Sequence, residues 1–191
     1  MEFFCYHRDR AGARDLRRQW GERHWSYMDG FAETMIARGP TYTEEGPTGS
    51  VHILGLPDAA AARAFAFDEP GHQAGVYRDV LLRRWRNTLG RTMWEHPMER
   101  DADGYLEVED GYLVVGLGAG EPADTDLPRD PSPLIAYGPL LSDDGDSWLG
   151  TAALLRASSS DAARSILTNG RYGSIDVHRW TPGGRPVLRS S

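Results

Sequence analysis

His24 is the residue of this chain whose type and position most directly suggest chemistry. It stands four residues after Trp20 and three before Tyr27, so the three side chains fall on one stripe of a helix, and that apolar stripe should face a sheet. An imidazole that titrates near neutrality can act as a general base. The alternative is a core histidine whose polar atoms are satisfied by hydrogen bonds and do no chemistry.

Two consecutive acids, Asp68 and Glu69, close an alanine-rich stretch directly before Pro70. A helix there should end at the proline, and the dipole of a helix disfavours acids at its C-terminal end. Their position therefore has two interpretations. They are ordinary residues of a solvated loop, or one of them is held close to another functional group while the other faces water.

His7 and His52 fall on two runs that are predicted to be neighbouring strands, so their rings could meet. A metal site needs more ligands, and no third one is evident, so we expect no metal. His52 is instead interpreted as a hydrogen-bonding residue that lines a pocket. The other predicted substrate contacts are Trp20, Tyr42 and Ser50.

The elements that must position these residues follow from periodicity and turn signals. Alternating or apolar runs predict strands at residues 2–7, 35–43, 51–56 and 75–85. Apolar residues at helical spacing predict helices at 13–32 and 58–67. The resulting order, β-α-β-β-α-β, is that of a ferredoxin-like unit and places the chain in the α+β class.

A second copy of this unit is predicted from an internal echo. Residues 35–40 read MIARGP and residues 134–139 read LIAYGP, and similar blocks follow both in the same order, closing on Arg-Trp at 84–85 and 179–180. Residues 121–133 contain four prolines where the first copy has its long helix, so the second copy should lack that helix. GLGAG at 116–120 leads into these prolines, which excludes a phosphate-binding helix N-terminus there.

These patterns divide the chain into two ferredoxin-like repeats with a connection between them. Residues 1–86 form repeat 1 with the candidate site, residues 87–110 an acidic linker and the start of a hairpin around the turn at 109–111, and residues 111–191 a degenerate repeat 2.

Composition excludes several classes of function. The net charge is −7, which argues against binding nucleic acid through a general positive field. All 21 basic residues are arginines, so a Schiff-base lysine and a P-loop lysine are excluded. Cys5 is the single cysteine and cannot form an intrachain disulfide. No run is long and apolar enough to span a membrane and the N-terminus does not resemble a signal peptide, so a soluble cytoplasmic protein is expected.

The pattern of residues 1–86 resembles the YCII-related (YciI-like) domain, with a weaker likeness at about 112–185. The resemblance is carried by His24 together with the segments Gly39-Pro40, Gly49-Ser50, Asp68-Glu69-Pro70 and Ala74-Gly75-Val76-Tyr77. Members of this family are similar to muconolactone isomerases and other dimeric α/β-barrel proteins, in which two ferredoxin-like sheets face each other. The resemblance implies a barrel of this kind with an apolar chamber between the sheets, where the rings of His7 and His52 could meet. The barrel would close either within one chain or between the two chains of a homodimer. The resemblance implies a histidine–carboxylate active site without a cofactor, and dehydrochlorination of a hydroxylated aromatic is one activity associated with it.

One departure from the family pattern leaves the carboxylate open. The family usually has Asp immediately before the proline, where this chain has Glu69 with Asp68 one position earlier. We therefore expect a cofactor-independent isomerase or eliminating lyase that acts on a cyclic or phenolic small molecule, with His24 as base and Asp68 or Glu69 as its partner. The alternatives are a non-catalytic module that binds a hydrophobic metabolite, and a structural dimerisation unit whose barrel is filled with side chains.

Overall fold

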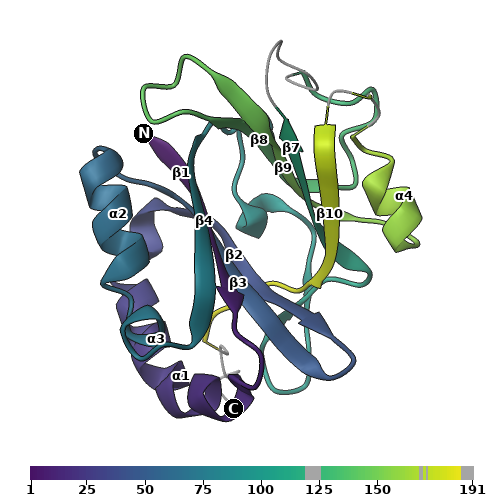
Figure 1. The fold of residues 1–191 in the computed structure, drawn as a ribbon. Coiled ribbons are helices and arrows are strands. Elements are labelled where there is room, and N and C mark those ends of the chain that lie inside the picture. Colours follow the sequence, from purple (N-terminus) through teal and green to yellow (C-terminus); the bar gives the residue numbers. More distant parts are fainter. Residues whose placement is uncertain (119–125, 168–169, 171, 186–191) are drawn as a thin grey trace.

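Eight antiparallel strands close a barrel within this one chain, in the order β1-β3-β2-β10-β7-β9-β8-β4 (Figure 1). The structure is a computed structural model that describes residues 1–118, 126–167, 170 and 172–185. Closure within the chain decides between the two arrangements left open by the sequence. The barrel strands are β1 (Glu2–Asp9), β2 (Met35–Thr43), β3 (Gly46–Gly55), β4 (Tyr77–Trp85), β7 (Gly111–Gly118), β8 (Leu134–Leu141), β9 (Trp148–Arg156) and β10 (Tyr172–Trp180).

The helices cover the outside of the barrel (Figure 1). They are α1 (Arg14–Asp29), α2 (Ala59–Phe67), α3 (Pro70–Gln73) and α4 (Ser160–Arg164). There are also short 3-10 helices, η1 (Ala32–Thr34) and η2 (Met93–Glu95), and η2 contributes Met93 to the barrel interior. The predicted helices at 13–32 and 58–67 correspond to α1 and α2, although α1 ends at Asp29. The one-turn helix α3 was not predicted. It forms because Pro70 is favourable at a first helical position and the Glu69 side chain accepts a hydrogen bond from the backbone N–H of His72.

The two halves of the barrel have the same strand order, β4-β1-β3-β2 in the first and β10-β7-β9-β8 in the second. Within each half the strands pair over most of their length. The halves meet at two seams, β2–β10 and β4–β8, and each seam has a register of only two residue pairs. One tryptophan, Trp180 or Trp85, lies in each seam.

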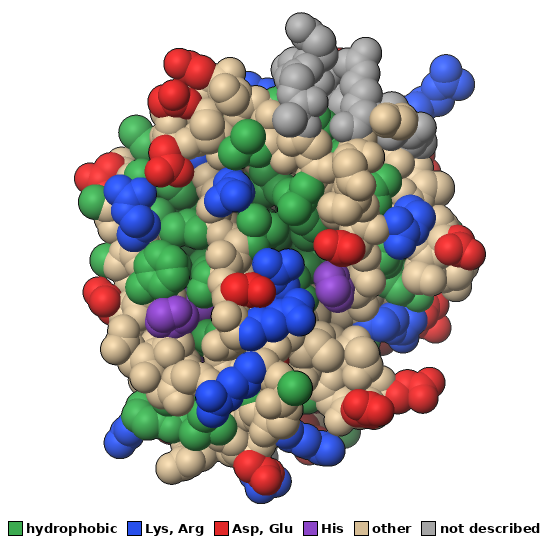
Figure 2. Space-filling view, viewed as in Figure 1, with side chains coloured by type: hydrophobic (Ala, Val, Ile, Leu, Met, Phe, Trp, Pro, Cys, Tyr) green, Lys and Arg blue, Asp and Glu red, His purple; other side chains and the backbone are tan. Residues whose placement is uncertain are grey.

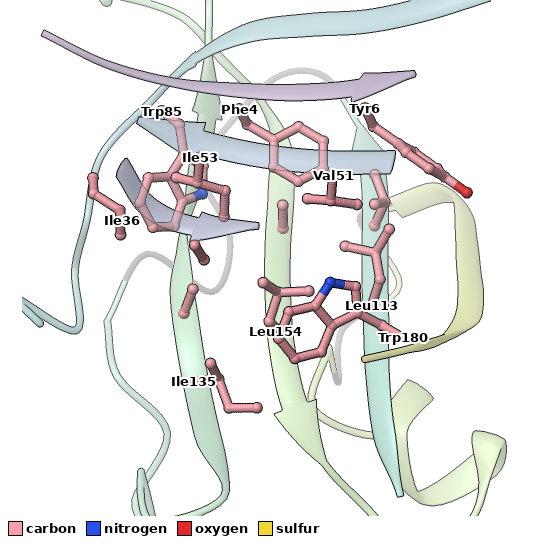
Figure 3. Close-up of a cluster of buried hydrophobic side chains, with 14 of the residues drawn as sticks. Phe4, Tyr6, Ile36, Val51, Ile53, Trp85, Leu113, Ile135, Leu154 and Trp180 are labelled. Atoms are coloured by element: carbon pink, nitrogen blue, oxygen red, sulfur yellow. The ribbon is translucent and has the colours of Figure 1, made fainter. Parts of the chain in front are cut away.

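Hydrophobic side chains from both halves fill the barrel interior (Figure 3). Phe4 and Tyr6 alternate along β1 and point inward, while Trp85 and Trp180 reach in from the seams. Met93 of η2 is fully buried in the same cluster, and its Sδ accepts the backbone N–H of Arg38 at 3.2 Å. The expected apolar chamber between the two sheets is therefore wrong, because side chains occupy that space.

The candidate site lies on the opposite, outer face of the sheet. Phe3, Cys5 and His7 alternate with the inward residues of β1, and Phe3 and Cys5 pack in a second cluster beneath α1 and α2. His52 of β3 has the same orientation, since it is paired with Cys5. The rings of His7 and His52 thus lie under the helices. The expectation that they meet inside the barrel is wrong.

The connection between the halves differs from the predicted hairpin. Residues 104–108 were expected to pair with residues 112–116, but β6 (Leu106–Glu107) pairs with β5 (Glu99–Arg100) in a separate small sheet. Both edges of β7 are already occupied by β9 and β10, so β7 has no edge left for a hairpin partner. Residues 126–133 contain no helix. Residues 119–125 lie outside the described residues. They include the start of the stretch at 121–133, where the second copy was predicted to lack a helix, and the last two residues of GLGAG.

Acidic and basic side chains are interspersed over the face drawn in Figure 2. In the described part of the chain, none of the helices has the length and apolar character needed to cross a membrane.

Candidate functional site

A cleft of about 790 Å³ opens between α1 and the outer face of β2 and β3. Its other walls come from the connection around β6 and from residues 181–184, which follow β10. Four of the residues predicted to be functional line it: Trp20, His24, Ser50 and His52.

His24 and Glu69 form the central contact of the site. His24 lies on α1, one turn after Trp20, and its side chain is 17% exposed. Its Nδ1 is 2.9 Å from Oε1 of Glu69, whose side chain is completely buried at the N-terminus of α3. Asp68, by contrast, is exposed at the end of α2. Of the two acids, Glu69 is thus the partner of His24 in this geometry.

The Glu69 carboxylate is held in its charged form. Burial alone would raise the pKa of Glu69, but the hydrogen bond and charge of His24 and the backbone N–H groups of Gly71 and His72 outweigh burial and lower that pKa to about 2. The Tyr77 hydroxyl lies against the same carboxylate. Burial first, and then the charge of Glu69, raise the pKa of Tyr77, which keeps this hydroxyl protonated and able to donate.

The charged carboxylate fixes the tautomer of His24. A carboxylate only accepts hydrogen bonds, so Nδ1 of His24 must donate to it. In the neutral ring the lone pair is then on Nε2, the nitrogen that does not contact Glu69, and His24 lines the cleft. This is the arrangement of a general base with an orienting carboxylate.

Two neutral histidines lie beside His24. The His52 ring is centred 5.3 Å from that of His24, and its buried Nδ1 has no hydrogen-bond partner in the described structure. Burial, followed by the charges of His24 and His7, lowers the pKa of His52 well below its usual value. His7 donates through Nε2 to the carbonyl oxygen of Ala66 at 2.8 Å, and its pKa is lowered by burial to about 4.

Arg17 anchors α1 to the sheet at one end of the cleft. Its Nη1 pairs with Asp9 at 2.9 Å, and its Nη2 donates to the Ser50 hydroxyl at 2.6 Å. The neighbouring arginine, Arg18, has a different environment. Its side chain is 80% exposed, whereas that of Arg17 is 20% exposed and that of Asp9 only 7%. Burial raises the pKa of Asp9, against the lowering effect of Arg17.

The segment at 181–185 closes the other end of the cleft. The backbone N–H of Gly183 donates to the carbonyl oxygen of Arg38 at 2.9 Å, and Nε of Arg38 returns a bond of 3.3 Å to the Gly183 carbonyl. Gly39 makes this close approach possible, because a Cβ atom there would overlap the carbonyl oxygen of Thr181. Arg185 then binds Glu22 and Asp29 on α1.

The predicted site residues are therefore divided. Trp20, Ser50 and His52 lie in the cleft with His24, but Tyr42 lies at the β2–β10 seam opposite Arg179 and does not line it. The sequence reasoning missed four groups: Arg17, Arg38, Tyr77 and the 181–185 segment. Only Tyr77 left a signal, as the last residue of the Ala74–Tyr77 block that supported the family resemblance.

The described residues contain no group of three or more His, Cys, Asp or Glu side chains placed to hold a metal ion. His7 and His52 do approach each other, with ring centroids 5.9 Å apart. Two imidazoles without a further ligand do not make a metal site.

The family model of the YCII-related domain matches residues 1–86, which include His24, Glu69 and Tyr77. Residues 1–86 are a YCII-related domain. The YCII-related domain thus supplies the histidine, its carboxylate and the floor of the cleft, while the second half of the barrel supplies the wall at 181–184. Among curated proteins, no match to the chain was found.

Several solved structures resemble this chain at low sequence identity, one of them with a TM-score above 0.5. A "putative chlorite dismutase" is 10% identical, with 94% of this chain and 95% of that chain covered at a TM-score of 0.52. A "putative monooxygenase" from Lactobacillus acidophilus is 8% identical, covering 95% of this chain and 93% of that one at a TM-score of 0.48. The 5-chloro-2-hydroxyhydroquinone dehydrochlorinase from Burkholderia phenoliruptrix is 23% identical over 48% of this chain and 99% of its own, at a TM-score of 0.44.

Proposed function

We propose that the chain is a cofactor-independent enzyme that transfers a proton on a cyclic or phenolic small molecule, as an isomerase or an eliminating lyase. The observation that carries this proposal is the contact of 2.9 Å between Nδ1 of His24 and the buried Glu69 carboxylate, at the wall of an open cleft. A histidine beyond reach of both acids would have favoured a binding module without chemistry.

In the proposed reaction, Nε2 of His24 removes a proton from a carbon next to a carbonyl group, which a phenol presents in its keto tautomer. The electron pair of the broken C–H bond moves into the ring as an enolate, and His24 becomes an imidazolium that is stabilised by the Glu69 carboxylate. Isomerisation follows if the proton is returned at another carbon. Elimination follows if the electron pair expels a leaving group such as chloride, and the imidazolium then gives its proton to water.

The remaining cleft residues have positioning roles in this proposal. The Ser50 hydroxyl is fixed by Arg17 and faces the cleft from β3. His52 is neutral and buried beside His24, so it presents a polar edge without adding a competing positive charge. Trp20 offers an aromatic surface for a flat ligand.

The test is proton transfer to and from carbon. Phloroglucinol, hydroxyhydroquinone and α-angelica lactone are incubated with the protein in deuterated buffer, and deuterium incorporation and lactone isomerisation are followed by NMR. We expect acceleration of at least one of these reactions, and a loss on the order of 10²- to 10⁴-fold in His24→Asn. The matched control is His178→Asn, because His178 lies on β10 and does not line the cleft. Equal rates for the wild type and His24→Asn would refute the role of His24.

We also propose that the two halves are repeats of one ferredoxin-like unit, with residues 1–86 and 111–191 joined by residues 87–110. The identical strand order of the halves supports this proposal. The first repeat carries α1 and with it His24, so the proposed chemistry takes place once per chain.

A further inference from the structure

We propose that the ligand of this cleft carries a carboxylate group and that Arg38 binds it. This inference rests on the proposed function of the same cleft and names the class of its substrate. The feature that carries it is a guanidinium group that lines the cleft, has a side chain only 16% exposed, and donates no hydrogen bond from its terminal nitrogens to the described residues.

The hydrogen bonds of Arg38 leave its binding edge free. A guanidinium has five N–H donors. In the described part of the chain, the Arg38 guanidinium donates one hydrogen bond, from Nε to the Gly183 carbonyl. Its ion pair with Asp29 is long, with 3.9 Å between Nη1 and Oδ1, and Arg185 contacts the other carboxylate oxygen of Asp29 at 2.6 Å. The two terminal nitrogens therefore remain available as a planar fork, which matches the two oxygens of a carboxylate.

The other charged groups that line the cleft differ from Arg38. Arg17 already uses both terminal nitrogens on Asp9 and Ser50, and Arg14 and Arg18 are exposed to solvent. Among the acids, Glu22 is paired with Arg185, the Asp101 carboxylate accepts two backbone N–H groups, and Glu107 is exposed. In the described part of the chain, none of these three acids forms an ion pair with Arg38.

Arg38 also has a suitable position relative to His24. It is directly opposite His52 in the antiparallel register of β2 and β3, so the two side chains lie on the same face of the sheet. The His52 ring is centred 5.3 Å from the His24 ring. A flat ligand that lies over His52 can thus place its carboxylate on Arg38 and a carbon at Nε2 of His24.

Pairs of compounds that differ only in charge test this inference. Benzoate is compared with benzamide, and phenylacetate with phenylacetamide, by NMR titration at neutral pH. For at least one pair we expect the acid to bind about tenfold more tightly than its amide. The preference should vanish in Arg38→Gln and survive in part in Arg38→Lys, which keeps the charge but loses the fork. The matched control is Arg18→Gln, which removes an exposed arginine at the mouth of the same cleft and should leave the preference unchanged.

The outcomes separate this inference from the proposed function. Equal binding of acids and amides, no measurable binding of either acid at millimolar concentration, or an unchanged preference in folded Arg38→Gln would overturn the inference. His24→Asn should retain the preference for the acid, because it leaves Arg38 in place. Loss of turnover in His24→Asn without any preference for acids would refute only the Arg38 subsite. A preference for acids with unchanged turnover in His24→Asn would refute only the proposed base.

Discussion

Nδ1 of His24 and Oε1 of Glu69 lie 2.9 Å apart, and the carboxylate that makes this contact is shielded completely from solvent. In Glu69→Gln a neutral amide replaces the charge that stabilises the imidazolium. We expect turnover to fall on the order of 10²- to 10⁴-fold, with a smaller change in KM. Steady-state kinetics on the substrate found by deuterium exchange would measure this. Glu69→Asp is the matched control, since it restores the charge on a shorter side chain and should recover part of the activity.

Glu69 should also make folding stability depend on acid pH. Its pKa is about 2 in the folded protein, against a usual value of 4.5. Between these values the unfolded chain binds more protons, so the contribution of Glu69 is complete above about pH 4.5 and is lost as the pH falls towards 2. The difference corresponds to at most about 3 kcal/mol. Urea unfolding at a series of pH values should show this slope in the wild type and a shallower one in Glu69→Gln. Parallel profiles would contradict it.

His7 should act in a higher pH range. Its pKa is about 4 when folded and 6.5 when unperturbed, so the unfolded chain again binds more protons between these values. The stability that comes from keeping His7 neutral is present above about pH 6.5 and is lost as the pH falls towards 4. In His7→Gln, whose amide can still donate to the Ala66 carbonyl, unfolding free energy should vary less across this interval. An unchanged dependence would show that other groups titrate there.

Gly39→Ala tests whether the 181–185 segment shapes the cleft. The new Cβ atom would overlap the Thr181 carbonyl oxygen, so the segment has to move away from β2. We expect weaker ligand binding and faster amide exchange at Gly183, whose N–H bonds to the Arg38 carbonyl. Gly21→Ala is the control, because a Cβ atom there meets nothing within 4 Å and its helical position favours alanine. Exchange at Gly183 that is the same in both variants would contradict the role of the segment.

Met93→Ala tests the packing of the barrel interior. Met93 is fully buried, and its removal leaves a cavity next to the backbone of Arg38. The expected cost is about 2–5 kcal/mol of unfolding free energy, measured by urea denaturation. Met98→Ala is the matched comparison, since Met98 is only partly buried against the same cluster and should cost less. Equal losses would indicate that η2 does not help to fill the barrel.

The local elements of the first half could be predicted because periodicity and turn residues act over short distances. The strand at 35–43 and the alanine-rich helix near 58–67 are examples. The hairpin around residue 110 failed because pairing is decided by which edges are free in the closed barrel, and β7 has none. A short sequence window carries no information about that competition.

The candidate site was predictable only in part for the same reason. The helical spacing placed His24 towards the sheet, but the choice between Asp68 and Glu69 depended on the one-turn helix α3, which buries the second acid. Arg38 and Gly183 are 145 positions apart, and only the closed barrel brings them together. The cleft was placed inside the barrel because the sequence does not say how completely Trp85 and Trp180 fill that interior.

The two seams of the barrel have a further consequence. Each is joined by two residue pairs, so packing of side chains, more than backbone hydrogen bonding, keeps the first half against the second. If the two halves separate, they should separate at the β2–β10 and β4–β8 seams, and each half should remain an intact sheet. The exposed inner surface of one half is then complementary to the missing half of any other copy, which makes exchange of halves between two molecules the expected route to a dimer at high concentration.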